Sequence, residues 1–145
     1  MRIALIFATL LSAPAPALAD ERSLFYMPND NDFRHQSIAK GPNEAKWPFA
    51  ESSGSISCAW ILGAQAVYFI PQSEIEGPAS EDEDYRILIV STNPLEMMIS
   101  NAANRDLLLP MQSPEEQIKR IAPYYALGLK LCEMQRGTNL GPAEL

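Results

Sequence analysis

The two cysteines of this chain constrain its fold more than any other feature. Cys58 lies in an apolar run near the middle of the sequence, and Cys132 lies close to its C-terminal end. In an oxidising compartment, an isolated pair of this kind ordinarily forms a disulfide. The bond would close a long loop, which a chain-entropy estimate values at about 4 kcal/mol. A C-x-x-C redox motif and a four-ligand zinc site are the alternatives, and the spacing favours neither.

The first residues of the chain predict such a compartment. Arg2 precedes a short apolar run, and Ala17-Leu18-Ala19 supplies the small-residue pattern of a signal-peptide cleavage site. The apolar run spans about 10 residues, whereas a membrane-spanning helix needs about 20. We therefore predict a cleaved signal peptide at residues 1–19, a mature chain that starts at Asp20, export to the periplasm and no stable membrane anchor.

The charge of the chain bears on its partners. The sequence has 11 Lys and Arg against 18 Asp and Glu, which gives a formal net charge of −7. An acidic protein is repelled by the phosphates of nucleic acids and by anionic lipids. Four acidic residues are consecutive, from Glu81 to Asp84, and such a run is typical of a solvated loop. The composition therefore argues against nucleic acid as a partner.

Three runs of apolar, β-branched or aromatic residues predict strands at 55–62, 66–70 and 85–91. The first two are separated by a short segment that contains Gly, which predicts a hairpin. The third is continuous enough to lie in the centre of a sheet. Because side chains alternate between the faces of a strand, Ile56 and Cys58 share one face, which we expect to be the core face.

A C-terminal helix has the strongest local signal. Ser113-Pro114-Glu115-Glu116 places a capping Ser before Pro at the first helical position and Glu at the third. Apolar residues at helical spacing then lead to Cys132. Pro123 interrupts this stripe, so either the helix kinks there or a second helix begins. Gly137 is expected to close the helix as its C-cap.

A helix that ends at Cys132 and a strand that buries Cys58 place the disulfide between helix and sheet. We therefore predict an α+β fold: a small antiparallel sheet with a C-terminal helix packed on it and one disulfide. The predicted organisation is a polar segment at 20–45 whose order the sequence leaves open, a single domain at 46–137 and a flexible tail at 138–145.

The Trp47-Pro48-Phe49 motif directly precedes the first predicted strand. Two large aromatic side chains around a rigid Pro are typical of a core plug that closes one end of a sheet. The same motif is the candidate surface for a protein partner, in the alternative that it faces solvent.

Methionines supply the candidate metal ligands. Met97 and Met98 are candidates for copper(I), because thioether sulfur is a soft ligand. His35 or Met27, from the N-terminal segment, would complete such a site. Core packing is the alternative interpretation of the methionines, and a surface residue without a task is the alternative for His35. No other metal and no cofactor is predicted.

A combination of these features resembles a known family. Trp47-Pro48-Phe49, the strand cysteine Cys58, its hairpin partner at 66–70 and Leu131-Cys132 in the terminal helix are similar to a pattern in small bacterial periplasmic proteins of unknown function. Some members of that family are encoded beside copper-resistance membrane proteins. The resemblance covers most of the mature chain. It implies periplasmic location, the disulfide and a copper-related context, and it implies no catalytic residues.

The sequence contains no nucleophile elbow, phosphate-binding loop, dinucleotide fingerprint or haem attachment motif. We therefore expect no enzyme but an exported binding or accessory module for a protein partner or a small ligand. A copper-handling protein with methionine ligands is the second hypothesis. A hydrolase that uses unassigned carboxylates is the third.

Overall fold

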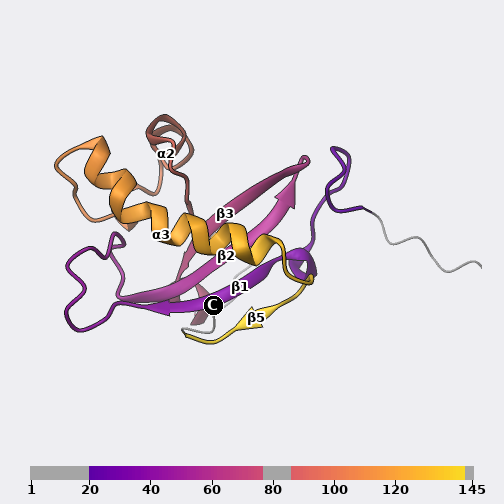
Figure 1. Ribbon diagram of the computed structural model, residues 1–145, viewed down its shortest axis with the longest axis horizontal. Helices are drawn as coiled ribbons and strands as arrows, with labels where there is room; N and C mark the ends of the chain where they lie inside the picture. Colours follow the sequence, from indigo (N-terminus) through magenta and orange to yellow (C-terminus); the bar gives the residue numbers. More distant parts are fainter. Residues whose placement is uncertain (1–19, 77–85, 143–145) are drawn as a thin grey trace, which may run out of the picture.

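The computed structural model describes residues 20–76 and 86–142. The predicted signal peptide and the acidic run Glu81–Asp84 lie outside the described residues. The described chain forms a five-stranded sheet with a long C-terminal helix across one face (Figure 1). A disulfide joins Cys58 to Cys132, whose Cα atoms are 5.3 Å apart. The predicted α+β fold is confirmed.

The sheet has the strand order β4-β3-β2-β1-β5. Neighbouring strands are antiparallel, except that β1 and β5 pair in parallel. The three long strands lie next to one another, and the two short ones form the edges. The strands are β1 (Arg34–Ala39), β2 (Ser53–Ile61), β3 (Ala64–Pro71), β4 (Leu88–Ile89) and β5 (Asn139–Leu140).

Strands β2 and β3 form the predicted hairpin, with Ile61 opposite Ala64. The turn between them consists of Leu62 and Gly63, whose φ angles are 50° and 76°. Positive φ at both central residues gives a backbone twist that matches the twist of the flanking strands. Gly63 adopts this conformation without strain. The tight turn therefore fixes the register at the centre of the sheet.

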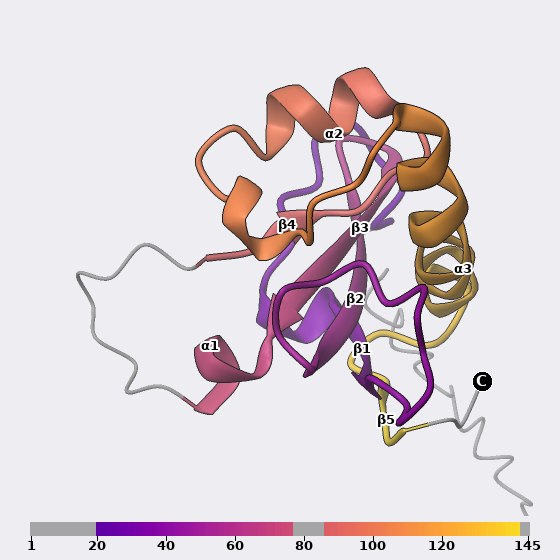
Figure 2. The same ribbon diagram turned by 90° about the vertical axis from the view of Figure 1, so that its left-hand side faces the viewer.

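The register divides the central side chains between two faces. Cys58 lies opposite Val67 and Ile56 lies opposite Phe69, and all four are buried in the core. The helix α3 (Pro114–Cys132) packs on this face. Figure 2 shows α3 along one side of the sheet only. We call the opposite side the open face.

The other helices are short. They are η1 (Asp30–Asp32), α1 (Gln72–Glu76), α2 (Pro94–Ser100) and η2 (Arg105–Leu107). In Figure 2, α1 lies on the side of the sheet away from α3, and α2 lies at one end of the sheet. Among the described residues, the open face therefore carries no long helix.

Helix α3 begins as predicted. Ser113 Oγ accepts a hydrogen bond from the Glu116 N–H, and Pro114 is the first helical residue. The Glu116 carboxylate accepts the N–H of Gln112, so the reciprocal bond reaches one residue further than in a standard capping box. The helix continues through Pro123, which is exposed. Pro123, which interrupts the apolar stripe in the sequence, therefore lies inside a single helix, and no second helix begins there.

The end of α3 differs from the prediction. The helix ends at Cys132 with Glu133 as its C-cap, before the expected Gly137. Gly137 has a φ of 72° in the following turn, where its N–H donates to the Phe33 carbonyl. The chain then forms β5 beside β1, so the segment expected to be a flexible tail contributes a strand.

The N-terminal boundary of the domain is also corrected. Strand β1 belongs to the sheet although it lies within the polar segment 20–45. Arg34 and Gln36 alternate with the less buried His35 and Ser37. The buried side chains of this strand are polar, so the hydrophobic pattern that reveals a strand is absent.

The strand expected at 85–91 is shorter and lies elsewhere. Only Leu88–Ile89 form β4, which pairs with β3 at the edge of the sheet. Leu88 and Val90 are nevertheless buried in the core. The run is apolar because its side chains are buried in the core. It does not indicate that the strand lies in the centre of the sheet.

A buried ionic network attaches the N-terminal segment to the end of α3. Arg34 is only 1% exposed and contacts the Glu21 carboxylate at 2.7 Å. Its guanidinium also donates to the carbonyls of Asp32 and Met134. Arg136 contacts the same Glu21 at 3.2 Å. These contacts place residues 20–34 against the chain that leaves α3.

Candidate functional site

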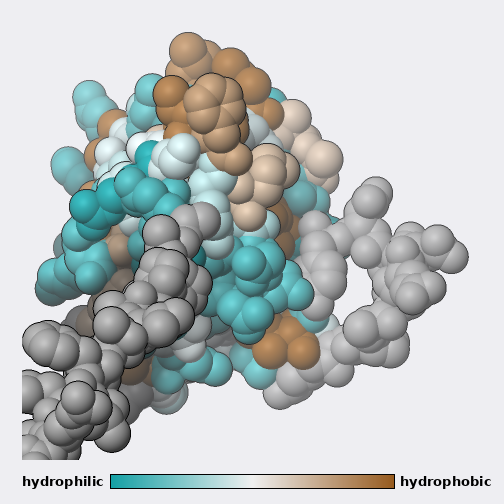
Figure 3. Space-filling model, turned by 90° about the vertical axis from the view of Figure 1, so that its right-hand side faces the viewer, coloured by the Kyte–Doolittle hydropathy of each residue, from teal (hydrophilic) through white to brown (hydrophobic). Residues whose placement is uncertain are grey.

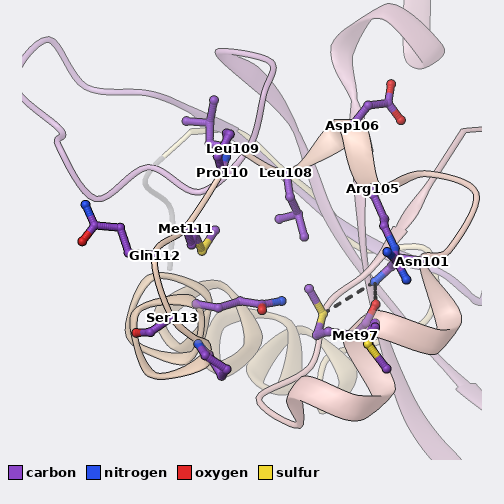
Figure 4. A pocket seen from close by; sticks show the side chains of 13 residues that line it. Met97, Asn101, Arg105, Asp106, Leu108, Leu109, Pro110, Met111, Gln112 and Ser113 are labelled. Atoms are coloured by element: carbon purple, nitrogen blue, oxygen red, sulfur yellow. Dashed lines mark hydrogen bonds between the residues drawn. The ribbon is translucent and has the colours of Figure 1, made fainter.

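A cavity of about 620 Å³ lies between α2, η2, the segment 108–113 and the start of α3 (Figure 4). We call it the methionine cavity, because Met97, Met98 and Met111 line it. Its volume is within the range of ligand-binding sites. The other lining residues are Asn101, Arg105, Asp106, Leu108, Leu109, Pro110, Gln112, Ser113, Pro114 and Gln117.

One wall of the cavity is held by Asn101, which is buried. Its Oδ1 accepts the Ile89 N–H at 2.7 Å, and its Nδ2 donates to the carbonyls of Ile89 and Met97 at 2.8 and 3.0 Å. The side-chain amide therefore pairs with both backbone groups of an edge strand, as a neighbouring strand would. This pairing fixes α2 against β4.

The opposite wall is held by backbone pairing. The Leu109 N–H donates to the Pro48 carbonyl at 2.8 Å, and the Ala50 N–H donates to the Leu107 carbonyl at 2.9 Å. The segment 107–109 is thus connected to the Trp-Pro-Phe segment like a short strand. Both walls of the cavity are anchored to the core.

The Trp-Pro-Phe motif itself is not a partner surface. Trp47, Pro48 and Phe49 are all buried. Phe49 stacks on Phe69 with ring centroids 3.8 Å apart, and Trp47 meets Phe49 edge to face. Buried rings present nothing to a partner, so the candidate surface at these residues is wrong. The core-plug interpretation is confirmed, and the plug supports the wall of the methionine cavity.

The three methionines of the cavity differ in their surroundings. Met97 is buried, and its sulfur accepts the Ser91 N–H at 3.2 Å and lies 3.7 Å from the Asn101 Nδ2. Met98 is about half exposed, at 51%. Figure 4 shows Met111 on the far wall from Met97. Of the predicted pair, Met98 therefore offers the accessible sulfur, while hydrogen bonds occupy that of Met97.

The other candidate copper ligands lie elsewhere. His35 projects from β1 to the open face, and burial lowers the pKa of its imidazole. Met27 is 79% exposed in the N-terminal segment. Neither residue lines the methionine cavity. Within the described parts of the chain, no three or more His, Cys, Asp or Glu side chains are grouped to hold a metal ion.

Helix α2 exposes an apolar stripe next to the cavity. Leu95, Met98 and Ile99 are 58%, 51% and 64% exposed. Their i, i+3, i+4 spacing places them on one side of the helix. A surface helix ordinarily turns such a side toward the core. We call these three residues the α2 stripe. Sequence analysis missed Leu95, Ile99 and Met111, although the spacing of the stripe was a visible signal.

Two opposite charges lie among the residues that line the cavity, Arg105 and Asp106. Asp106 also forms an ion pair with Arg86. The hydrogen bond and the positive charge of Arg86 lower the pKa of the Asp106 carboxyl. The lining of the cavity therefore has little net charge, and the α2 stripe meets it at Met98.

A second group of exposed apolar residues lies at another place. Figure 3 shows hydrophobic side chains gathered at the top of the face that carries the N-terminal segment. Leu24, Phe25 and Met27 of that segment and Leu62 of the β2–β3 turn are exposed. Leu24 lies against Gly63 of the same turn. None of these residues lines one of the described cavities.

No described helix is long and apolar enough to cross a bilayer. No protein-family model, curated protein or solved structure matches this chain. The function therefore has to be argued from the surfaces described above.

Proposed function

We propose that this chain is an exported, non-enzymatic binding or accessory module, and that it docks an apolar segment of a partner protein on the α2 stripe. The observation that supports this most is the exposure of Leu95, Met98 and Ile99 beside a cavity. Contiguous exposed apolar residues mark interaction sites more often than chance. Methionine adapts its shape to different apolar partners, which suits a docking surface.

The free energy of burying the α2 stripe is too small for stable binding, so the partner must supply further contacts. Full burial of one large apolar side chain contributes about 1.5–3 kcal/mol. The three residues of the stripe are already partly covered, so their burial would contribute on the order of 3–4 kcal/mol. Micromolar affinity needs about 8 kcal/mol. The partner therefore also has to insert an apolar anchor side chain into the methionine cavity.

Export to the periplasm is part of the proposal. The closed Cys58–Cys132 bond and the signal pattern at 1–19 support it, because disulfides persist in oxidising compartments. Intact-mass measurement on protein from an exporting cell tests it directly. The proposal expects a chain that starts at Asp20 and lacks the two thiol protons. A chain that retains residue 1 and free thiols would overturn this part.

Site-specific photo-crosslinking tests the docking surface. A photoreactive amino acid is placed at Met98 in one variant and at Met27 in the matched control, and both are irradiated in cells that export the chain. We expect an adduct of defined mass from position 98 only. Ile99→Asp in the same chain should abolish it, because a charge in the stripe is costly to bury. Ile99 is 64% exposed, so this change should leave the melting temperature unaltered.

Three results would contradict the docking proposal. Position 98 could give no adduct, the adduct could persist with Ile99→Asp, or position 27 could give the same adduct. An adduct of twice the chain's mass would identify a second copy as the occupant and would exclude a different protein as the partner.

Copper(I) handling is the second candidate function. The observation that favours it is that Met98 and Met111 line the same cavity. Thioether ligands select copper(I), and the oxidised cysteines leave these sulfurs as the soft donors of the cavity. Titration with copper(I) against a competing chelator should show binding that Met98→Leu and Met111→Leu remove together. Met27→Leu is the control. Binding that survives the double substitution would exclude these ligands.

A further inference from the structure

The open face carries a cavity of about 470 Å³ that is separate from the methionine cavity. We call it the aromatic cavity. It is lined by Asp30, Phe33, His35, Tyr68, Ile70 and Ile87. A second cavity of about 350 Å³ shares His35 and Ile70 with it, so the hollow continues along the open face. Its volume is that of a site for a small molecule.

The sheet register brings three rings together in this cavity. His35 and Tyr68 lie on either side of Ser57 in one row across β1, β2 and β3. The Phe33 ring lies 6.2 Å from that of Tyr68, tilted by 53°, and 6.2 Å from that of His35, nearly parallel to it. Phe33 and Tyr68 therefore form two inclined aromatic walls. The faces of such rings carry negative potential, which attracts cations.

The described lining of the cavity carries a negative charge. Among the lining residues that the structure describes, Asp30 is the only Asp, Glu, Lys or Arg. Burial lowers the pKa of His35 and raises that of Tyr68, so both are neutral at pH 7. Arg34, the neighbour of His35 in β1, lies on the α3 side of the sheet with Glu21. A cation would thus meet a carboxylate and ring faces.

Ser57 adds a polar group at the centre of this row. It is fully buried, and its hydroxyl has no hydrogen-bond partner among the described residues. A buried hydroxyl without a partner is costly. Ser57 does not line the cavity, so its hydroxyl lies beneath the row of rings and is not a ligand contact.

We propose that the aromatic cavity binds a small organic cation with an alkylated ammonium group, which lies over the rings of Phe33 and Tyr68 and is balanced by Asp30. This site is independent of the docking surface on α2. The alkyl groups match the apolar lining from Ile70 and Ile87. The positive charge, which methyl groups spread over a larger volume, matches the ring faces and the carboxylate.

Calorimetric titration with a pair of isosteric probes tests the charge requirement. Choline carries a trimethylammonium head, and 3,3-dimethylbutan-1-ol has the same shape without the charge. We expect choline to bind at millimolar or lower concentration and the neutral alcohol to bind at least about tenfold more weakly, since cation–π and carboxylate attraction are lost. The result that both bind equally would overturn the cation proposal, as would the absence of choline binding.

Two substitutions locate the site. Asp30→Asn and Phe33→Leu should each weaken choline binding about tenfold or more. Glu115→Gln, which removes an exposed carboxylate in the first turn of α3, is the matched control and should leave binding unchanged. Asp30 is exposed, so Asp30→Asn should also leave the melting temperature unchanged. Equal weakening by Glu115→Gln would show that choline senses only the net charge of the chain, and the assigned site would be wrong.

Discussion

At the scale of single residues, the contact between α3 and the sheet depends on Gly128. It is buried, and an added Cβ would lie 2.2 Å from Val67 Cγ1 and 2.7 Å from Val67 Cγ2. Gly in a helix interior costs about 1 kcal/mol relative to Ala. The backbone of α3 approaches β3 closely enough at this point that no side chain fits, and this packing offsets the cost.

Gly128→Ala should therefore destabilise the protein although it improves helix propensity. Overpacking costs about 1–3 kcal/mol and the propensity gain returns about 1, so we expect a net loss of up to about 2 kcal/mol. Urea denaturation measures it. Adding Val67→Ala should reduce the penalty of the Gly128 change, because it frees the space that the new methyl group needs. A more stable Gly128→Ala variant would show that α3 can shift without cost.

The contact between Glu21 and Arg34 makes the free energy of unfolding depend on pH. The hydrogen bond and charge of Arg34 lower the pKa of the Glu21 carboxyl below its ordinary value of 4.5. A lowered folded-state pKa contributes stability above the unfolded value, and this contribution is lost as the pH falls through the folded value. Glu21→Gln should therefore weaken the pH dependence of unfolding below about pH 4.5.

The same substitution should cost about 3 kcal/mol at pH 7, because it leaves the buried guanidinium of Arg34 without its carboxylate. Urea denaturation at a series of pH values measures both effects. Glu115→Gln removes an exposed carboxylate and is the control. Identical pH profiles for the two variants would mean that the Arg34 pair contributes nothing to acid sensitivity.

The sequence predicted the burial of some residues, but it did not predict the contacts of others. The burial of Cys58 followed from strand alternation, and that of Phe49 from its large apolar ring. The role of Asn101 could not be predicted, because its side chain bonds to the backbone of β4, and that partner is known only from the tertiary structure. The placement of His35 and Tyr68 in one row likewise depends on the strand register.

At the scale of helices and strands, the sequence patterns that predict each element differ in strength. The β2–β3 hairpin and α3 were predicted because each has a long periodic pattern and a clear turn or cap. Strands β4 and β5 have two residues each, too few for any periodicity, and β1 buries polar side chains. The apolar side of α2 was missed because periodicity predicts that such a side faces the core, and here it faces solvent.

Pro123 offers a test at this scale. A Pro in a helix interior removes one hydrogen bond and crowds the preceding turn, which costs about 3 kcal/mol. Pro123 is exposed, so Ala would meet no packed neighbour there. We expect Pro123→Ala to stabilise the protein by about 1–2 kcal/mol, since Pro also restricts the unfolded chain. Thermal unfolding followed by circular dichroism measures it.

A lower melting temperature of Pro123→Ala would contradict this expectation. It would mean that the proline shapes α3 where the next residue, Tyr124, donates its hydroxyl hydrogen to Glu44 at 2.6 Å. Tyr124→Phe in both backgrounds separates the two effects. If the proline acts through this bond, the two substitutions will not be additive.

At the scale of the whole molecule, the disulfide joins the two layers of the fold. It closes a loop of 74 residues between β2 and the end of α3. We expect the double variant Cys58→Ala/Cys132→Ala to lose about 4 kcal/mol of stability, mainly because the unfolded chain gains freedom. Urea denaturation with and without reductant measures it. The reductant should destabilise the wild type and leave the double variant unchanged, and equal stability of both proteins would contradict the estimate.

The overall architecture was predictable where one long helix had to cover one sheet. The two cysteines specified which elements meet, so the layer order followed from the sequence. The functional surfaces were not predictable in the same way. The aromatic cavity is assembled from segments that are distant in the sequence, such as those of Phe33 and Tyr68. The methionine cavity is lined by residues within 97–117, and its shape depends on how this irregular stretch folds.

The parallel pairing of β1 with β5 has a consequence for biosynthesis. Residues 35 and 36 lie beside residues 139 and 140, so this edge of β1 lacks its β5 partner until residue 140 has left the ribosome. Contacts between residues so distant in sequence form slowly. A polypeptide that crosses a membrane through a narrow channel has to remain unfolded during its passage. This topology delays the pairing of β5, which is compatible with the export proposed above.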